Sequence, residues 1–168
     1  MSAAEDDARG ILRLYWADPL DLSAIPVDPI KIANRLGIAV YEERLADGVS
    51  GKLVKRAHET AVISINRDDA LVRQRFTCAH ELGHYFQRMI KSRDEAFAFV
   101  DHRAHLAGLG VAESEVYANA FAAALLMPHE ILKGRLEAGL GPSALSKYFV
   151  VSEVAMRYRI QNTEHLRL

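Results

Sequence analysis

The sequence lacks several features that define large classes of protein. It has one cysteine in 168 residues, which excludes an internal disulfide framework and suits a reducing compartment. Its longest apolar run, Ala120–Met127, is far shorter than the roughly 20 residues of a membrane-spanning helix. The start of the chain, Met1–Gly10, is acidic and polar and does not have the pattern of a signal peptide. We therefore expect a cytoplasmic protein with no membrane partner.

An excess of charge of one sign is also missing. The 21 basic and 22 acidic residues leave a formal net charge of −1, so no overall field attracts nucleic acid or an anionic surface. Hydrophobic residues make up 50% of the chain, which is ordinary for a globular protein. A chain of this length can bury one substantial core. We expect a single domain over residues 1–168, present as a monomer.

The stretch with recognisable chemistry is RFTCAHELGHYFQR, which begins at Arg75 and contains the pattern H-E-x-x-H. It lies in a segment predicted to be one helix from about Ala70 to Ile90. Side chains four residues apart on a helix lie one above the other, so His80 and His84 can bind the same ion. Zinc binds histidine nitrogen and in catalytic sites keeps one position for water, from which Glu81 can take a proton.

Two histidines on a helix can also be ordinary surface residues, but the flanking residues argue against that interpretation. Apolar side chains cover the side away from the histidines, which indicates a buried helix with one polar stripe. Cys78 should face the core as a small hydrophobe and not join the metal. Gly83 costs about 1 kcal/mol relative to alanine in a helix interior, so we expect another backbone to approach closely there.

Two helices are predicted before this motif, and neither is expected to carry chemistry. Ser2 and Glu5 have the spacing of a capping box at the start of the first helix. The second begins where Asp28 precedes Pro29, and Gly37 ends it.

Three strands are predicted next, at Ile38–Glu42, Val49–Val54 and Thr60–Ile65. Their short connections imply a small three-stranded antiparallel sheet packed on the H-E-x-x-H helix. An edge strand of such a sheet can bind an extended peptide through backbone hydrogen bonds. Gly48 and Ser50 are candidates for this contact, because the segment they belong to would let a substrate backbone approach. The alternative, that the glycines of this segment only form turns, is equally open.

A third protein ligand is needed for a catalytic zinc site. The predicted helix Ala112–Leu126 offers two carboxylates near its start, Glu113 and Glu115. Glu115 and Asn119 lie one turn apart on the same face. That face can supply a metal ligand and a hydrogen-bond partner that fixes the tautomer of a ligand histidine. We expect one Zn²⁺ per chain.

The last part of the chain, residues 141–168, is predicted to be a helix-turn-helix-like subdomain that follows a catalytic core of residues 1–140. Its two helices are Pro142–Phe149 and Ser152–Gln161. Arg157 and Arg159 can reach phosphate, which supports an alternative function: a DNA-binding transcriptional regulator with a protease-like core. Two arginines in a chain of net charge −1 give only a weak positive surface for nucleic acid, so direct nucleic-acid binding is not expected. We predict instead that the pair packs on the core and that the two arginines recognise the substrate.

A family resemblance is carried by two motifs, RFTCAHELGHY and E-x-x-x-N-x-F-A-A-x-L-L-M-P. Together they resemble the ImmA/IrrE family of zinc metallopeptidases, whose arrangement is gluzincin-like. Similar segments are PVDPIKIANRLGI and FVVSEVAMRYRI, so the resemblance extends from about Ile25 to Gln161. It implies that His80 and His84 are zinc ligands and that Glu81 is the catalytic carboxylate.

The resemblance also implies that Glu115 is the third zinc ligand. Tyr117 stands where many relatives have a second glutamate, which favours Glu115 over Glu113 because the register E-x-x-x-N is kept. The family implies cleavage of a DNA-binding repressor, commonly of the helix-turn-helix type, in response to stress or a mobile-element signal.

These observations lead to one prediction of fold and function. We expect an α+β zincin-like domain, mostly helical with one small sheet, that acts as a zinc-dependent endopeptidase. Its protein substrate is expected to be a helix-turn-helix repressor encoded nearby, so that cleavage relieves repression. A zinc amidase acting on small molecules is a further alternative, which the sheet edge and the resemblance both disfavour.

Overall fold

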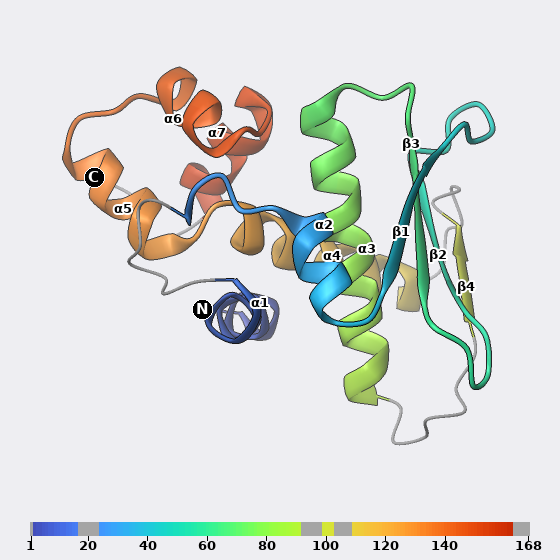
Figure 1. The fold of residues 1–168 in the computed structure, drawn as a ribbon. Helices are drawn as coiled ribbons and strands as arrows, with labels where there is room; N and C mark the ends of the chain where they lie inside the picture. The colour runs from blue at the N-terminus through green and yellow to red at the C-terminus, as the bar shows by residue number, and fades with distance from the viewer. Residues whose placement is uncertain (1, 17–23, 92–98, 103–108, 163–168) are drawn as a thin grey trace.

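The computed structural model describes residues 2–16, 24–91, 99–102 and 109–162 of the chain (Figure 1). In these ranges the chain forms seven helices and four strands. The helices are α1 (Ala3–Tyr15), α2 (Pro29–Arg35), α3 (Leu71–Lys91), α4 (Leu109–Leu126), α5 (His129–Glu137), α6 (Pro142–Phe149) and α7 (Glu153–Asn162). The strands are β1 (Ala39–Glu43), β2 (Gly51–Lys55), β3 (Val62–Asn66) and β4 (Phe99–His102). None of the described helices combines the length and apolar character needed to cross a lipid bilayer.

The sheet differs from the predicted one in topology. It has four strands in the order β1-β3-β2-β4, and β1 runs parallel to β3 while the other pairs are antiparallel. The prediction of a three-stranded antiparallel sheet was therefore wrong. The turn at Gly48, where φ is 79°, does join β1 to β2, but β3 lies between these two strands. Connection length alone could not reveal this crossover, and no strand was expected at Phe99–His102.

Helix α3 lies between the sheet and the C-terminal helices α5, α6 and α7, as Figure 1 shows. On the sheet side it packs against β2 and β3, and on the other side against α4. The core therefore runs on both sides of α3, and Leu82, Ile63 and Phe121 are among its fully buried side chains. The prediction of one long helix over the H-E-x-x-H motif is confirmed, and so is the burial of Cys78 in the core.

The contact between α3 and α4 is unusually close at Gly83. A Cβ atom at this position would lie 2.9 Å from the Cα atom of Ala118 and 3.2 Å from the Cβ atom of Phe121. The prediction that another backbone approaches Gly83 is therefore confirmed. The small side chain of Ala118, together with Gly83, allows the two helices to come this close.

Arg75 joins α3 to two segments far away in the sequence. Its guanidinium donates to the carbonyl oxygens of Val27 (2.7 Å), Val150 (3.1 Å) and Phe149 (3.5 Å). These acceptors belong to the segment before α2 and to the C-terminal end of α6. Burial lowers the pKa of Arg75, while the charge of Asp28 opposes that effect. Arg75 thus fixes the C-terminal helices on the helix that carries the motif.

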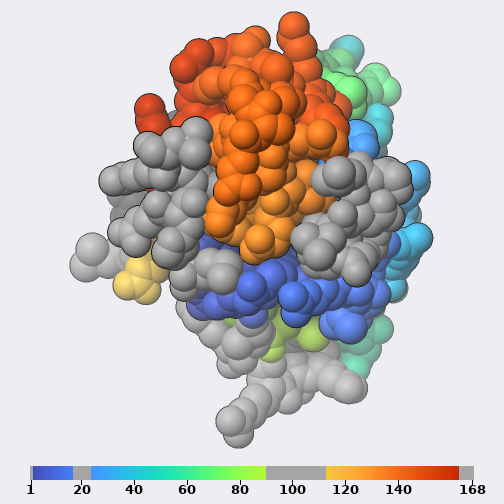
Figure 2. All heavy atoms as spheres, turned by 90° about the vertical axis from the view of Figure 1, so that its left-hand side faces the viewer, coloured from blue at the N-terminus to red at the C-terminus, as the bar shows by residue number. Residues whose placement is uncertain are grey.

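The two ends of the described chain also meet. Figure 2 shows α1 directly below the C-terminal helices on one face of the molecule. The predicted capping box is present, with Ser2 Oγ accepting from the Glu5 backbone and Glu5 accepting from the Ser2 backbone. The same Glu5 carboxylate pairs with Arg159 of α7, whose side chain is buried. Arg159 is therefore held by Glu5 and does not project freely towards a partner.

Gly83→Ala should destabilise the protein, because the added methyl group cannot fit between α3 and α4. Overpacking of this kind typically costs about 1–3 kcal/mol. Gly134→Ala is the matched control, since Gly134 also lies within a helix but has open space around its Cβ position. Gly134→Ala should stabilise the folded protein by up to about 1 kcal/mol. Urea unfolding of both variants measures these changes, and an equal change in the free energy of unfolding in the two variants would contradict the prediction.

The Glu5–Arg159 pair should contribute stability that depends on pH. Burial alone would raise the pKa of Glu5, but Arg159 and the Ser2 backbone N–H hold that pKa below its ordinary value. A carboxyl whose pKa is lower in the folded than in the unfolded state stabilises the folded state. This stabilisation is fully present at a pH above the unfolded-state pKa, and it is lost as the pH falls through the folded-state pKa.

Glu5→Gln should therefore lower the free energy of unfolding at pH 7 by about 1.5–3 kcal/mol, the range for a charged hydrogen bond. The difference should vanish in acid, where the wild-type carboxyl is also neutral. Asp6→Asn is the control, because the Asp6–Arg9 pair is exposed and should contribute less than about 1 kcal/mol. Urea titrations at several pH values would refute this if Glu5→Gln matched wild type at pH 7.

Candidate metal centre

Three side chains from two helices converge on one point. His80 Nε2 and His84 Nε2, both on α3, lie 2.9 Å apart. The Glu115 carboxylate of α4 approaches them, with one oxygen 3.4 Å from His80 Nε2 and the other 3.1 Å from His84 Nε2. Candidate ligand atoms of all three residues lie within 4.8 Å of one another. Both histidines are buried, and Glu115 is partly exposed.

The outer nitrogen of each histidine has its own hydrogen-bond partner. His80 Nδ1 lies 3.0 Å from Asn119 Oδ1, an acceptor, so Nδ1 carries the proton. His84 Nδ1 lies 3.1 Å from Ser114 Oγ, whose own proton is donated to Gln87 Oε1 at 2.6 Å. Ser114 therefore accepts from His84. These assignments follow from the hydrogen-bond pattern and leave a lone pair on both Nε2 atoms.

The donor set fits a zinc ion. Two lone pairs and a carboxylate directed at one point repel one another unless a cation lies between them. Nitrogens bound by one zinc at about 2.0–2.1 Å cannot be more than about 4.2 Å apart, and these two are 2.9 Å apart. Histidine, histidine and glutamate are also a known ligand set for catalytic zinc. His80, His84 and Glu115 are thus suited to hold the ion.

Glu81 lies on the same helix but faces a different element. Successive residues turn by about 100° around a helix, so Glu81 projects about 60° from His84 and 100° from His80. It is buried, and a Cβ atom at Gly51 would lie 3.5 Å from its Oε1 atom. Gly51 begins β2, so the carboxylate lies on the sheet side of the site while Glu115 comes from the α4 side.

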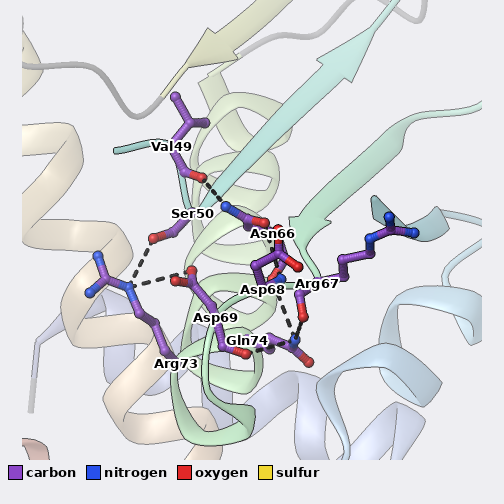
Figure 3. Close-up of polar contacts among 8 residues, drawn as sticks. All are labelled: Val49, Ser50, Asn66, Arg67, Asp68, Asp69, Arg73 and Gln74. Atoms are coloured by element: carbon purple, nitrogen blue, oxygen red, sulfur yellow. Dashed lines mark hydrogen bonds and ion pairs between the residues drawn. The ribbon is translucent and has the colours of Figure 1, made fainter. Parts of the chain in front are cut away.

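The segment before β2 is hydrogen-bonded to the start of α3 and to the end of β3 (Figure 3). The buried Ser50 hydroxyl accepts from Arg73 Nε at 2.9 Å, and the Val49 carbonyl accepts from the Asn66 side chain at 3.1 Å. Gly48 lies in the exposed turn that precedes them. Contact of Gly48 and Ser50 with a substrate stays a prediction, and the Ser50 hydroxyl already has a partner in Arg73.

The remaining predicted site residues lie in different places. Asn119 is next to His80, as its expected role requires, whereas Glu113 is exposed and lies outside the cluster. Arg157 is exposed on α7 and binds Glu153 of the same helix at 2.5 and 3.0 Å. Arg159 is buried against Glu5. The two arginines therefore do not form one exposed basic surface, and their recognition of a substrate stays a prediction.

Sequence reasoning missed Ser114 and Gln87, which together orient His84. A weak signal was present for each residue. Ser114 directly precedes Glu115 on α4, and Gln87 follows His84 by three residues, within one turn on α3. What the sequence could not supply is the crossing of the two helices, which brings these polar side chains together.

Comparison with known proteins gives a family match and several similar solved structures. The sequence matches the family described as IrrE N-terminal-like domain (Peptidase_M78) over residues 33–161. No curated protein sequence gives a match. A Mycobacterium tuberculosis transcriptional regulator has a similar structure, with a TM-score of 0.65 and 17% sequence identity. The alignment covers 96% of this chain and 47% of the regulator, so this chain spans less than half of that protein's length.

Removing the third ligand should weaken zinc binding. Glu115→Ala leaves two imidazoles without the carboxylate, whereas Glu113→Ala removes an exposed carboxylate outside the cluster and should change nothing. We expect one zinc per chain in wild type and in Glu113→Ala, with affinity reduced at least tenfold in Glu115→Ala. Elemental analysis and competition with a chromogenic chelator measure both quantities. Loss of zinc in Glu113→Ala alone would overturn the assignment.

Proposed function

The chain belongs to the IrrE N-terminal-like (Peptidase_M78) family, and from that membership and the geometry of the site we propose that it is a zinc-dependent endopeptidase of zincin-like fold. The observation that carries this proposal is the convergence of His80, His84 and Glu115 around one point. A buried carboxylate, Glu81, directly follows the first of these ligands on the same helix.

Each side chain of the site has a definite part in peptide hydrolysis. Zinc, when bound, supplies Lewis acidity that polarises the scissile carbonyl and makes water more acidic. Glu81 accepts a proton from the attacking water and returns it to the leaving amine. Asn119 and Ser114 hold the two imidazoles in the tautomer that leaves Nε2 unprotonated. Buried side chains around the histidines exclude bulk water and strengthen these interactions.

The substrate we propose is a helix-turn-helix repressor encoded near this gene, cleaved in the cytoplasm by a monomeric enzyme in response to stress or a mobile-element signal. A protein of similar structure is a transcriptional regulator, which supports a role in transcription control. We expect a short extended segment of the repressor to enter the site, because the two histidines and Glu81 are buried and a folded helix would not reach them.

A DNA-binding regulator is the second candidate, favoured by the description of the structural neighbour. Two observations weigh against it here. Arg159 forms a buried ion pair with Glu5, and Arg157 forms an ion pair with Glu153. The net charge of −1 also gives no overall positive field that would attract phosphate. DNA binding that falls with salt and survives Glu81→Gln would favour the regulator.

Glu81→Gln should separate metal binding from chemistry. Glutamine has the size of glutamate but cannot accept the proton, so the variant should keep its zinc and lose turnover by about 10²–10⁴-fold. The zinc-loaded proteins would be incubated with a peptide library prepared from a bacterial proteome, with and without chelator, and new termini identified by mass spectrometry. Equal cleavage by wild type and Glu81→Gln would refute the proposed function.

A further inference from the structure

A large groove lies beside the metal centre and has no part in the chemistry described above. Its volume is about 910 Å³, close to the upper end of the range for small-molecule pockets. The walls are formed by the first half of α3, by α4 and by α7, with the start of α1 at one side. Nothing in the hydrolytic mechanism requires a space of this size.

The groove reaches the metal centre through two residues. Asn119, whose side chain contacts His80 Nδ1 at 3.0 Å, lines the groove. Phe76 also lines it, and its ring lies 6.3 Å from the His80 ring. Arg73, Phe76 and His80 are spaced three and four residues apart, so they follow one face of α3 from the groove to the site. The groove therefore borders the metal centre on the Nδ1 side of His80.

The surface of the groove is apolar and exposed. Val116 (69% exposed) contributes from α4, and Val154 (79%) and Tyr158 (66%) contribute from α7. They are three of the seven large hydrophobic residues that are exposed in the described part of the chain. Concentration of such residues in one concave surface is typical of a binding site. On α7 the exposed apolar residues of the groove are thus Val154 and Tyr158.

The walls favour a helical partner over an extended one. An extended peptide needs free backbone N–H and C=O groups to pair with, as at a sheet edge. Helices α3, α4 and α7 use their backbone groups internally, so an extended chain here would leave its own unpaired. An amphipathic helix brings its backbone hydrogen bonds with it and needs only apolar contacts from the groove.

The charge of the groove indicates an acidic residue on that helix. Glu5 and Arg159 line it and neutralise each other. Arg73 also lines it, and its contacts to Ser50 (2.9 Å) and Asp69 (3.5 Å) both use Nε. Figure 3 shows the two terminal nitrogens of Arg73 pointing away from these partners. They are placed to receive a carboxylate at the rim.

We propose that this groove binds an amphipathic helix of the protein substrate, with apolar residues at i, i+3 or i+4, and i+7 and an acidic residue opposite Arg73. The chain that continues from the docked helix passes over Asn119 to the metal centre. This inference rests on the proposed function and deepens it, because it says how a folded substrate is held while an adjoining extended segment is cut.

The test uses the zinc-loaded Glu81→Gln protein, which binds without cutting, to select from random 16-residue peptides displayed on phage. Enriched peptides should have helical apolar spacing and an acidic residue. Val154→Asp and Tyr158→Ala should each weaken their binding at least tenfold, and Arg73→Gln by up to about fivefold. Leu14→Asp, an equally exposed apolar position away from the groove, should have no effect.

Three results of the selection would overturn the proposal. They are failure to enrich any peptide, enriched peptides without helical spacing, and enriched peptides that bind Val154→Asp as tightly as Leu14→Asp. Unchanged zinc content and unfolding midpoints in these variants exclude a general loss of structure. Light scattering that showed a dimer dissociated by Val154→Asp would also overturn it, because the occupant would then be a second copy.

A second step distinguishes failure of the inference from failure of the proposed function. The selected peptide is extended at each end by eight random residues and incubated with zinc-loaded wild type. We expect cuts in one extension that chelator abolishes and that Val154→Asp slows at least tenfold. Groove-dependent binding without any cut would leave the docking site in place and refute the peptidase. Cuts unaffected by Val154→Asp would refute the docking site alone.

Discussion

At Gly83 the backbone of α3 lies so close to α4 that one added methyl group would reach the Cα atom of Ala118. The candidate site depends on this contact. Glu115 reaches the two histidines, Ser114 reaches His84 Nδ1 and Asn119 reaches His80 Nδ1 because α4 is held at this distance. If the helices were separated by the width of a side chain, each of these contacts would exceed hydrogen-bond range. A packing constraint therefore determines the geometry of the chemistry.

The position of α3 also divides the molecule into two parts with different means of recognition. On one side the sheet approaches Glu81 through Gly51, and an edge strand of a sheet can bind an extended chain through backbone hydrogen bonds, although β2 itself is paired on both sides. On the other side α4 and α7 form an apolar groove of helices. A polypeptide that is helical along one part and extended along the next is complementary to both, and the metal centre lies where these parts meet.

Much of the helical structure could be predicted from the sequence because its signals are local. Capping residues such as Ser2 and Asp28, and the period of the apolar residues, gave helix ends close to those observed. The order of the strands depends on which partner each strand finds across the sheet, and neither turn residues nor alternation contains that information. The strand at Phe99–His102 was missed for the same reason.

Within the site, residues whose relation depends on spacing along one helix could be predicted from the sequence, and residues that meet through contact between two helices could not. The pairing of His80 with His84 follows from a four-residue spacing, whereas Ser114 and Gln87 meet only because α3 and α4 cross. The burial of Arg159 depends likewise on α1, the most distant helix in sequence. An arginine near the end of a chain is ordinarily exposed, and only the tertiary structure reveals that this one has a carboxylate to bury against.

The three carbonyl groups bound by Arg75 fix the distance between α7 and the metal centre. Because Phe149 and Val150 are tied to α3, helix α7 and the metal centre belong to one rigid frame. For any chain docked on α7, the number of residues between the docked helix and the metal centre is then fixed by the length of that frame. The position of cleavage would then be set by its distance from the bound helix, and the enzyme would have little sequence specificity at the cleaved bond itself.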